Sequence, residues 1–149
     1  MVQNIEIGVD FDGTVCTELD RTWFYRLMWK LFPRIWIEIS HRLARRTKFV
    51  VPWGSYIITG RPGWMKNLTL KQMKRWGLED CTLIIDEAKV QIGVGGTKWK
   101  IDNIRRLGID IFYENSPGVA KRIKREFPDK RIILVDELST PIVLENLTN

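Results

Sequence analysis

Residues 4–14 read NIEIGVDFDGT, and this stretch decides the fold. Every second residue from Ile5 to Phe11 is apolar, which is the period of a β-strand, and a glycine turn signal follows directly. A buried strand is therefore expected here. Two carboxylates, Asp10 and Asp12, stand where that strand gives way to the turn.

The spacing of the two acids needs a chemical reason. Side chains two residues apart on a strand point the same way, so Asp10 and Asp12 are expected to face one small site. Two carboxylates that close together repel each other unless they share a proton or a cation. A magnesium ion would supply that cation.

Strand and helix patterns alternate along the rest of the chain. Short apolar runs predict further strands at residues 56–58, 82–85, 109–113 and 131–135. A helix is expected after the first of these runs, ending at Trp76 before Gly77, and helical patterns separate the last three. The alternation predicts an α/β domain with a central parallel sheet of about five strands, covered by helices on both faces.

The best-marked helix follows the fourth strand. Ser116 can cap it and Pro117 suits its first turn. Its expected inner face consists of Val119, Ile123 and Phe127. The basic side chains expected to face largely outward are Lys121, Arg122, Lys124 and Arg125.

Residues able to do chemistry stand at the ends of the predicted strands. Asp10 and Asp12 close the first strand, Thr59 follows the second, and Glu114 with Asn115 closes the fourth. In open parallel sheets, ligands bind beyond the carboxyl ends of the strands, where the strand order reverses. These side chains are therefore expected to meet at one site.

The segment at residues 10–14, Asp-Phe-Asp-Gly-Thr, resembles the first motif of the haloacid dehalogenase (HAD)-like hydrolase superfamily, small phosphatase type. Such a string would arise by chance in a chain this long on the order of once in a thousand. Residues 57–61, Ile-Ile-Thr-Gly-Arg, look like the second motif, and a lysine followed by residues 109–115 looks like the third and fourth. The resemblance covers nearly the whole chain and implies a Rossmann-like three-layer sandwich.

The resemblance also implies roles for individual residues in phosphoryl transfer. Asp10 would attack phosphorus and form an acyl-phosphate, and Asp12 would act as general acid and base while its backbone carbonyl binds magnesium. Thr59 would donate a hydrogen bond to a phosphoryl oxygen, and a lysine would neutralise charge. Spacing to the end of the following helix favours Lys100 over Lys98, and at least one of the two is expected to be exposed.

The fourth motif departs from the pattern of the family, which usually places an acid where this chain has an amide. Asn115 can ligate magnesium through its amide oxygen but adds no charge, so lower metal affinity is expected, with Glu114 compensating directly or through water. The substrate contacts expected are Gly60, Arg61 and Lys98, and the metal contacts are Asp10, Asp12, Glu114 and Asn115. This departure leaves open a second interpretation, a catalytically weakened binding module that acts through a Trp-rich, basic insert at about residues 17–50.

Two other activities would use a similar framework. HAD-type dehalogenases generally lack the second acid and need no metal, whereas Asp12 is present here, so a dehalogenase is the poorer match. A phosphomutase or phosphotransferase would use the same residues and would differ mainly in what accepts the phosphoryl group. The sequence therefore favours Mg²⁺-dependent hydrolysis of a phosphate monoester without naming its substrate.

An insert at about residues 17–50 separates the first two motifs and is longer than a flap and one helix require. Residues 21–32 are apolar nearly all round, Pro33 interrupts them, and a second helix-like stretch with several arginines follows. A helical cap over the active site is preferred to an interfacial membrane segment or an oligomer contact. His41, the one histidine in the chain, is expected to be a surface residue.

The length of the chain limits the number of domains, and its net charge favours certain classes of partner. The 149 residues suffice for one buried core but not for two ordinary domains and a linker, so 1–149 is read as one domain. A net charge of +6 favours anionic partners. A small phosphorylated substrate is expected, a nucleic-acid end and a membrane surface stay open, and the oligomeric state is undetermined.

Cysteine usage and hydropathy point to the cytoplasm. Cys16 and Cys81 form no Cys-x-x-Cys pair, and the first residues lack the pattern of a signal peptide. No apolar run approaches the roughly 18 residues that a transmembrane helix needs. A cytoplasmic protein that does not span a membrane is therefore expected.

Overall fold

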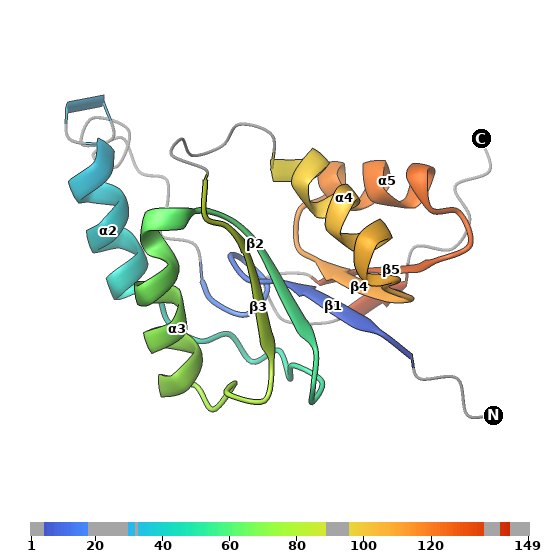
Figure 1. Cartoon of the computed structure of the whole chain (residues 1–149), viewed down its shortest axis with the longest axis horizontal. Coiled ribbons are helices and arrows are strands. Elements are labelled where there is room, and N and C mark those ends of the chain that lie inside the picture. The colour runs from blue at the N-terminus through green and yellow to red at the C-terminus, as the bar shows by residue number, and fades with distance from the viewer. Residues whose placement is uncertain (1–4, 18–29, 32, 89–95, 136–140, 144–149) are drawn as a thin grey trace.

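The computed structural model describes residues 5–17, 30, 31, 33–88, 96–135 and 141–143, to which all structural statements below refer (Figure 1). The strands are β1 (Ile7–Asp10), β2 (Tyr56–Pro62), β3 (Thr82–Asp86), β4 (Ile111–Glu114), β5 (Arg131–Val135) and β6 (Pro141–Val143). The helices are α2 (Pro33–Leu43), the short 3₁₀ helix η1 (Gly63–Met65), α3 (Lys66–Arg75), α4 (Gly96–Leu107) and α5 (Pro117–Glu126).

The strands form one sheet in the order β3-β2-β1-β4-β5-β6. The five strands β1 to β5 pair in parallel, which confirms the predicted parallel sheet, and β6 adds a short antiparallel edge strand that was not predicted. β1 lies in the centre, with Val9 opposite Ile57 on one side and Tyr113 on the other. The strand order reverses between β1 and β4, so a ligand site is expected beyond the end of β1.

Two clusters of buried side chains lie on opposite faces of this sheet. Successive strand residues alternate between them: Ile57 belongs to one cluster and Ile58 to the other. The first cluster includes Met73 of α3, and the second includes Ile104 of α4 and Ile123 of α5. Helices therefore cover both faces, as predicted, with α3 on one side and α4 and α5 on the other (Figure 1).

Helix α5 corrects two details of the sequence analysis. Ser116 stands at the N-cap position, but within the described chain its side chain makes no capping hydrogen bond; its backbone N–H donates to Glu114 Oε1 at 3.0 Å instead. Lys124 does not face outward. It is 9% exposed, and its Nζ donates to the carbonyls of Pro128 and Lys130, both at 2.9 Å. Lys124 thus provides hydrogen-bond donors for two backbone carbonyls of the turn after α5.

The insert leaves and rejoins the sheet at one place, directly after the acidic motif. Thr17 N–H donates to the carbonyl of Arg45 at 2.8 Å, and Thr47 N–H donates to the carbonyl of Val15 at 2.9 Å. The Thr47 hydroxyl also donates to the carbonyl of Thr14 at 2.5 Å. Helix α2 lies where the second helix-like stretch was expected, whereas most of residues 21–32 lie outside the described residues.

The free cysteines agree with a chain that has no disulfide framework. Cys16 is buried, Cys81 is half-buried, and both are free thiols. Within the described ranges, none of the helices combines the length and the apolar character required to span a bilayer.

Candidate active site at the carboxyl ends of β1, β2 and β4

The acidic motif begins on the last residue of β1. Asp10 ends the strand, is 4% exposed and accepts a hydrogen bond from the backbone N–H of Phe11 at 2.9 Å. The chain then turns through Gly13, whose φ of 83° is a conformation that favours glycine. In this turn the two carboxylates make separate sets of contacts, so Asp10 and Asp12 belong to two neighbouring clusters.

The first cluster joins β1, α4 and β4 around a lysine. Lys100 Nζ lies 2.9 Å from Asp10 Oδ2 and 2.6 Å from Glu114 Oε2. All three residues are buried, with Glu114 at 0% exposed. Asp10 and Glu114 come from the ends of adjacent parallel strands, which is why one side chain from α4 can reach both.

The two candidate lysines prove to be far from equivalent. Lys98 has an 81% exposed side chain and lies 4.0 Å from Asp102 on the same helix, whereas Lys100 is 8% exposed. Positions two apart on a helix point to nearly opposite sides, so only one of them can face Asp10. The structure therefore decides in favour of Lys100 and leaves Lys98 on the surface.

Charge in this first cluster is unbalanced. Burial and the neighbouring Glu114 carboxylate raise the pKa of Asp10 well above its usual range, although Lys100 opposes the shift. Despite its burial, Lys100 has a raised pKa because Asp10 and Glu114 both favour its charged form. Two carboxylates beside one ammonium leave an excess of negative charge, which either a proton on Asp10 or a further cation beside it would offset.

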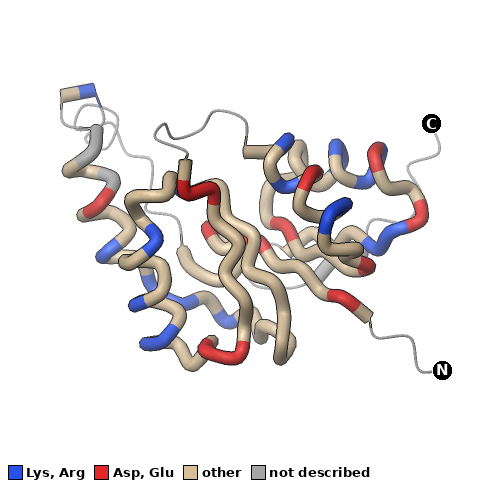
Figure 2. Tube along the Cα trace, in the orientation of Figure 1, with Lys and Arg blue, Asp and Glu red and all other residues tan. Residues whose placement is uncertain are grey.

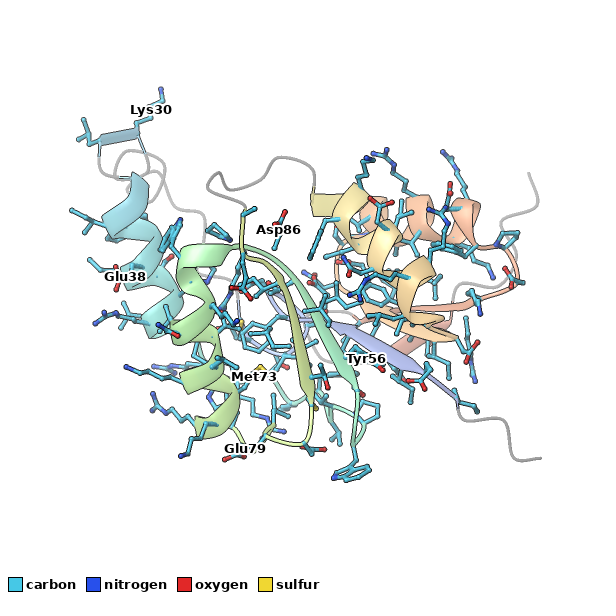
Figure 3. All side chains as sticks on the ribbon, viewed as in Figure 1. Lys30, Glu38, Tyr56, Met73, Glu79 and Asp86 are labelled. Carbon is cyan, nitrogen blue, oxygen red and sulfur yellow. The ribbon has the colours of Figure 1, made fainter. Side chains whose placement is uncertain are left out.

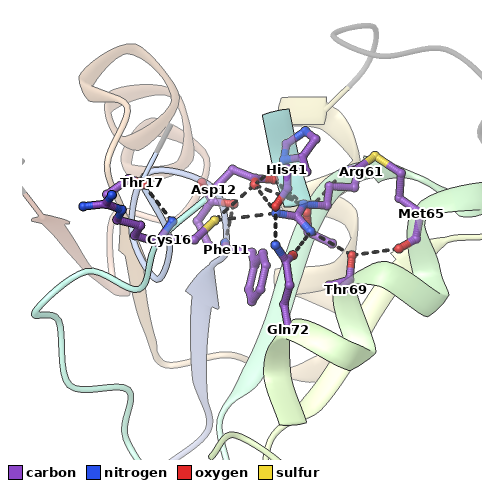
Figure 4. Close-up of polar contacts among 12 residues, drawn as sticks. Phe11, Asp12, Cys16, Thr17, His41, Arg61, Met65, Thr69 and Gln72 are labelled. Carbon is purple, nitrogen blue, oxygen red and sulfur yellow. Dashed lines mark hydrogen bonds and ion pairs between the residues drawn. The ribbon is translucent and has the colours of Figure 1, made fainter. Parts of the chain in front are cut away.

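The second cluster holds Asp12 through a buried arginine (Figure 4). Arg61 Nη2 lies 2.6 Å from Asp12 Oδ1, and its Nε lies 3.0 Å from both carboxylate oxygens. Its Nη1 donates to Thr69 Oγ1 at 3.0 Å and to Gln72 Oε1 at 2.6 Å. The side chain is 1% exposed, so Arg61 positions Asp12 and is not placed to contact a substrate as the sequence analysis expected.

His41 brings the insert into this second cluster. Its Nδ1 lies 3.5 Å from Asp12 Oδ1, its side chain is 25% exposed, and its carbonyl accepts a hydrogen bond from Gln72. The expectation that His41 is a plain surface residue was wrong. No local pattern could have revealed the contact, because it depends on α2 docking beside α3, far along the chain.

The environment of Asp12 favours its ionised form. Burial acts against the charge, but the Arg61 guanidinium and the contact with His41 outweigh it and hold the pKa of Asp12 well below its usual range. Thr59 Oγ1 and Cys16 Sγ lie 3.4 Å from the same carboxylate, which adds two weaker contacts. Asp12 is therefore ionised, and its low pKa makes it a weak base.

The surroundings of two glycines locate two further predicted residues, Asn115 and Gly60. A Cβ added to Gly13 would fall 1.9 Å from Asn115 Nδ2, so the amide of Asn115 packs directly on this loop. A Cβ added to Gly60 would meet the Cα of Gly96 at 3.9 Å, which places the backbone of β2 beside the start of α4. Asn115 is thus brought to the site.

The predicted metal ligands do not all fit a metal ion equally well. The Asp10 carboxylate, the Asp12 carbonyl and the Asn115 amide stand around the same loop, and the excess negative charge favours a cation there. Both oxygens of Glu114 already have partners in Lys100 and Ser116. Among the described residues, no three or more His, Cys, Asp or Glu side chains are grouped to hold a metal, so a site would depend on the amide and carbonyl oxygens.

Comparisons of this chain with family models, with curated proteins and with solved structures found no significant match in any of the three. The chemistry of the site is therefore argued from this chain's own residues. They place a buried carboxylate beside an ammonium at the switch point of a parallel sheet, with a second carboxylate next to it.

Proposed function

We propose that this chain is a HAD-like, Mg²⁺-dependent phosphohydrolase that cleaves phosphate monoesters through an aspartyl-phosphate at Asp10. The observation that carries the proposal is the contact of 2.9 Å between Asp10 and Lys100 at the end of the central strand. A phosphoryl group brings negative charge to a carboxylate, so attack is feasible only where a cation already stands. Lys100 supplies that cation.

The first step would be attack of Asp10 on phosphorus. A bond forms between a carboxylate oxygen of Asp10 and phosphorus while the ester P–O bond breaks, and the alcohol leaves with one proton. Water then attacks the acyl-phosphate, releases inorganic phosphate and restores Asp10. Lys100 would remain beside the reacting oxygens through both displacements, because Glu114 holds its Nζ from the other side at 2.6 Å.

Asp12 would transfer the protons in this scheme. Its low pKa, set by Arg61 and His41, keeps the carboxylate ionised for the second step, in which a base takes a proton from the attacking water, but it also makes Asp12 a weak base. The first step needs a proton on the same carboxylate or on the substrate itself. We therefore expect protonation of the leaving oxygen to be the more demanding half of the reaction.

Magnesium would be held by the Asp10 carboxylate, the Asp12 backbone carbonyl and the Asn115 amide oxygen. When bound, the ion offsets charge on the phosphoryl oxygens and on Asp10. Glu114 contributes indirectly, through Lys100, rather than as a ligand. Since an amide replaces an acid, we expect weaker binding of Mg²⁺ than in a site with two acidic ligands.

The second candidate is a catalytically weakened module that binds phosphorylated ligands or a partner through the insert. Two observations favour it: Asp12 is paired in its ionised form, and Asn115 adds no charge to the metal site. A binding module would keep its ligand affinity when the nucleophile is removed. An enzyme would lose turnover while remaining folded, and that difference separates the two candidates.

The decisive experiment measures phosphate release from an aryl phosphate and a panel of nucleotides and sugar phosphates, with and without Mg²⁺. Wild type is compared with Asp10→Asn and with Asp129→Asn, a matched change at an exposed position outside the site. Metal-dependent turnover that is lost in Asp10→Asn and kept in Asp129→Asn supports the proposal. Equal turnover in all three proteins contradicts Asp10 as the nucleophile, and an absence of turnover in wild type favours the binding module.

A further inference from the structure

Helix α2, together with Leu31 shortly before it, exposes a row of aliphatic side chains. Leu31, Ile35, Ile39 and Leu43 recur every four residues and are 58%, 61%, 40% and 62% exposed. Residues with that spacing on a helix lie along one side of it. The opposite side faces the protein, since Ser40 is buried. We call these four residues the apolar row.

A basic patch adjoins the end of this row. Helix α3 contacts α2, because Gln72 donates to the carbonyl of His41, and beyond the ends of the two helices Arg46 Nη1 donates to the carbonyl of Trp76 at 2.5 Å. Figure 2 shows Lys and Arg gathered along α3 and at the end of α2. The exposed members of this basic patch are Arg42, Arg45, Arg46, Lys48, Lys71, Lys74 and Arg75.

Helix α5 provides an internal comparison. It is also basic, and Lys121, Arg122 and Arg125 are exposed. Its apolar residues, however, pack in the core, with Ile123 at 0% exposed. An exposed aliphatic row beside a basic patch is therefore a feature of α2, and it does not follow simply from the basic composition of the chain.

We propose that the apolar row and the basic patch together dock this protein on an anionic lipid membrane. A helix lying in the membrane interface buries one apolar side while basic residues beside it are attracted to acidic headgroups. Both components are present here at adjoining positions.

The kind of exposed side chain separates a membrane from nucleic acid. Proteins that bind single strands combine basic grooves with aromatic side chains on which bases stack, and duplex binders use polar side chains on phosphates and base edges. Leucine and isoleucine serve neither purpose. Figure 3 shows side chains along the outer side of α2 extending away from the sheet, as docking on a surface requires.

The test is flotation of the full chain with vesicles of phosphatidylcholine, with and without phosphatidylserine. We expect binding to the anionic vesicles only, and we expect it to weaken as salt is raised toward about 1 M, where the Debye length falls to about 3 Å. Equal binding to both vesicle types would contradict the proposed attraction between the basic patch and acidic headgroups. Binding to an oligonucleotide with no binding to either vesicle would overturn the proposal in favour of a nucleic-acid surface.

Matched variants test each component of the surface separately. Ile35→Ser should weaken vesicle binding about tenfold, because it removes one apolar side chain from the interface, whereas Ile5→Ser, at a similar exposure of 64%, should not weaken it. Lys71→Gln with Lys74→Gln should weaken binding about thirtyfold, and Lys121→Gln with Arg122→Gln on α5 should have little effect. Equal losses in variant and control contradict the assignment. No readout depends on phosphatase turnover, so this proposal can fail independently of the proposed function.

Discussion

At the scale of single residues, the candidate site depends on two cations that are buried for different purposes. Lys100 stands between Asp10 and Glu114, and Arg61 holds Asp12. Burying a charge is costly unless it is paired, so each cation and its carboxylates are stable only together. Removing one charged group should therefore lower the free energy of unfolding by much more than the pair as a whole contributes to it, because its partner stays buried without a counter-charge.

Replacing Lys100 tests this dependence. Lys100→Met leaves two buried carboxylates without a cation and should lower the free energy of unfolding at pH 7 by about 3–5 kcal/mol. Lys98→Met, two residues away but 81% exposed, should change it by less than about 0.5 kcal/mol. Urea unfolding of both variants measures the difference. Similar values for the two would mean that the buried lysine does not stabilise the cluster.

The pairing of Asp12 predicts a pH dependence with a definite sign. Its folded-state pKa lies well below the unfolded value of about 3.9, so the stabilisation is fully present above that value and is lost as the pH falls through the folded pKa. Asp12→Asn should thus be markedly less stable than wild type at pH 7, and the difference should narrow in acid. Unfolding curves measured from pH 7 downward check this; a gap that widens in acid would contradict it.

At the scale of elements, the turn after β1 is the most constrained segment of the site. Gly13 combines a φ of 83° with the amide of Asn115 packed where a side chain would stand. Gly13→Ala should therefore destabilise the protein by more than about 1 kcal/mol, because it adds strain and a clash. The added methyl group must also displace Asn115, so the proposed Mg²⁺-dependent turnover should fall as well.

A second glycine serves as the control for that change. A Cβ added to Gly118, near the start of α5, meets none of the described residues within 4 Å. Gly118→Ala should stabilise the protein by about 0.4–1 kcal/mol through the reduced freedom of the unfolded chain. Thermal unfolding of the pair measures opposite shifts in Tm. A destabilised Gly118→Ala would show that the effect at Gly13 is general to glycine replacement.

At the scale of the whole molecule, the sheet lies between two buried clusters, and we expect them to unfold as one cooperative unit. Met73→Ala on one face and Ile123→Ala on the other should each cost about 2–5 kcal/mol. The two residues share no cluster, so in the double variant the costs should add to within about 0.5 kcal/mol. Unfolding followed by two probes should give one transition, and separate transitions for the two faces would contradict a single domain.

Much of the fold could be predicted because the spacing of apolar residues along the sequence indicates strands and helices. Alternation of apolar residues located β1, a short apolar run located β5, and the turn glycine at Gly77 placed the end of α3 to within one residue. The third strand extended only one residue beyond its predicted end. The short strand β6 was missed, since three residues paired with an edge strand carry no period of their own.

The candidate site was predicted as a set of residues but not as a set of contacts. Local sequence determined that two acids follow the central strand and that a parallel α/β sheet carries them, because strand and helix periods depend on neighbours along the chain. Only the tertiary structure decided that Lys100 rather than Lys98 reaches Asp10, that Arg61 turns inward to Asp12, and that His41 joins them from the insert. Those choices depend on which helix packs over which strand end, and residues separated by dozens of positions meet through packing that no local pattern records.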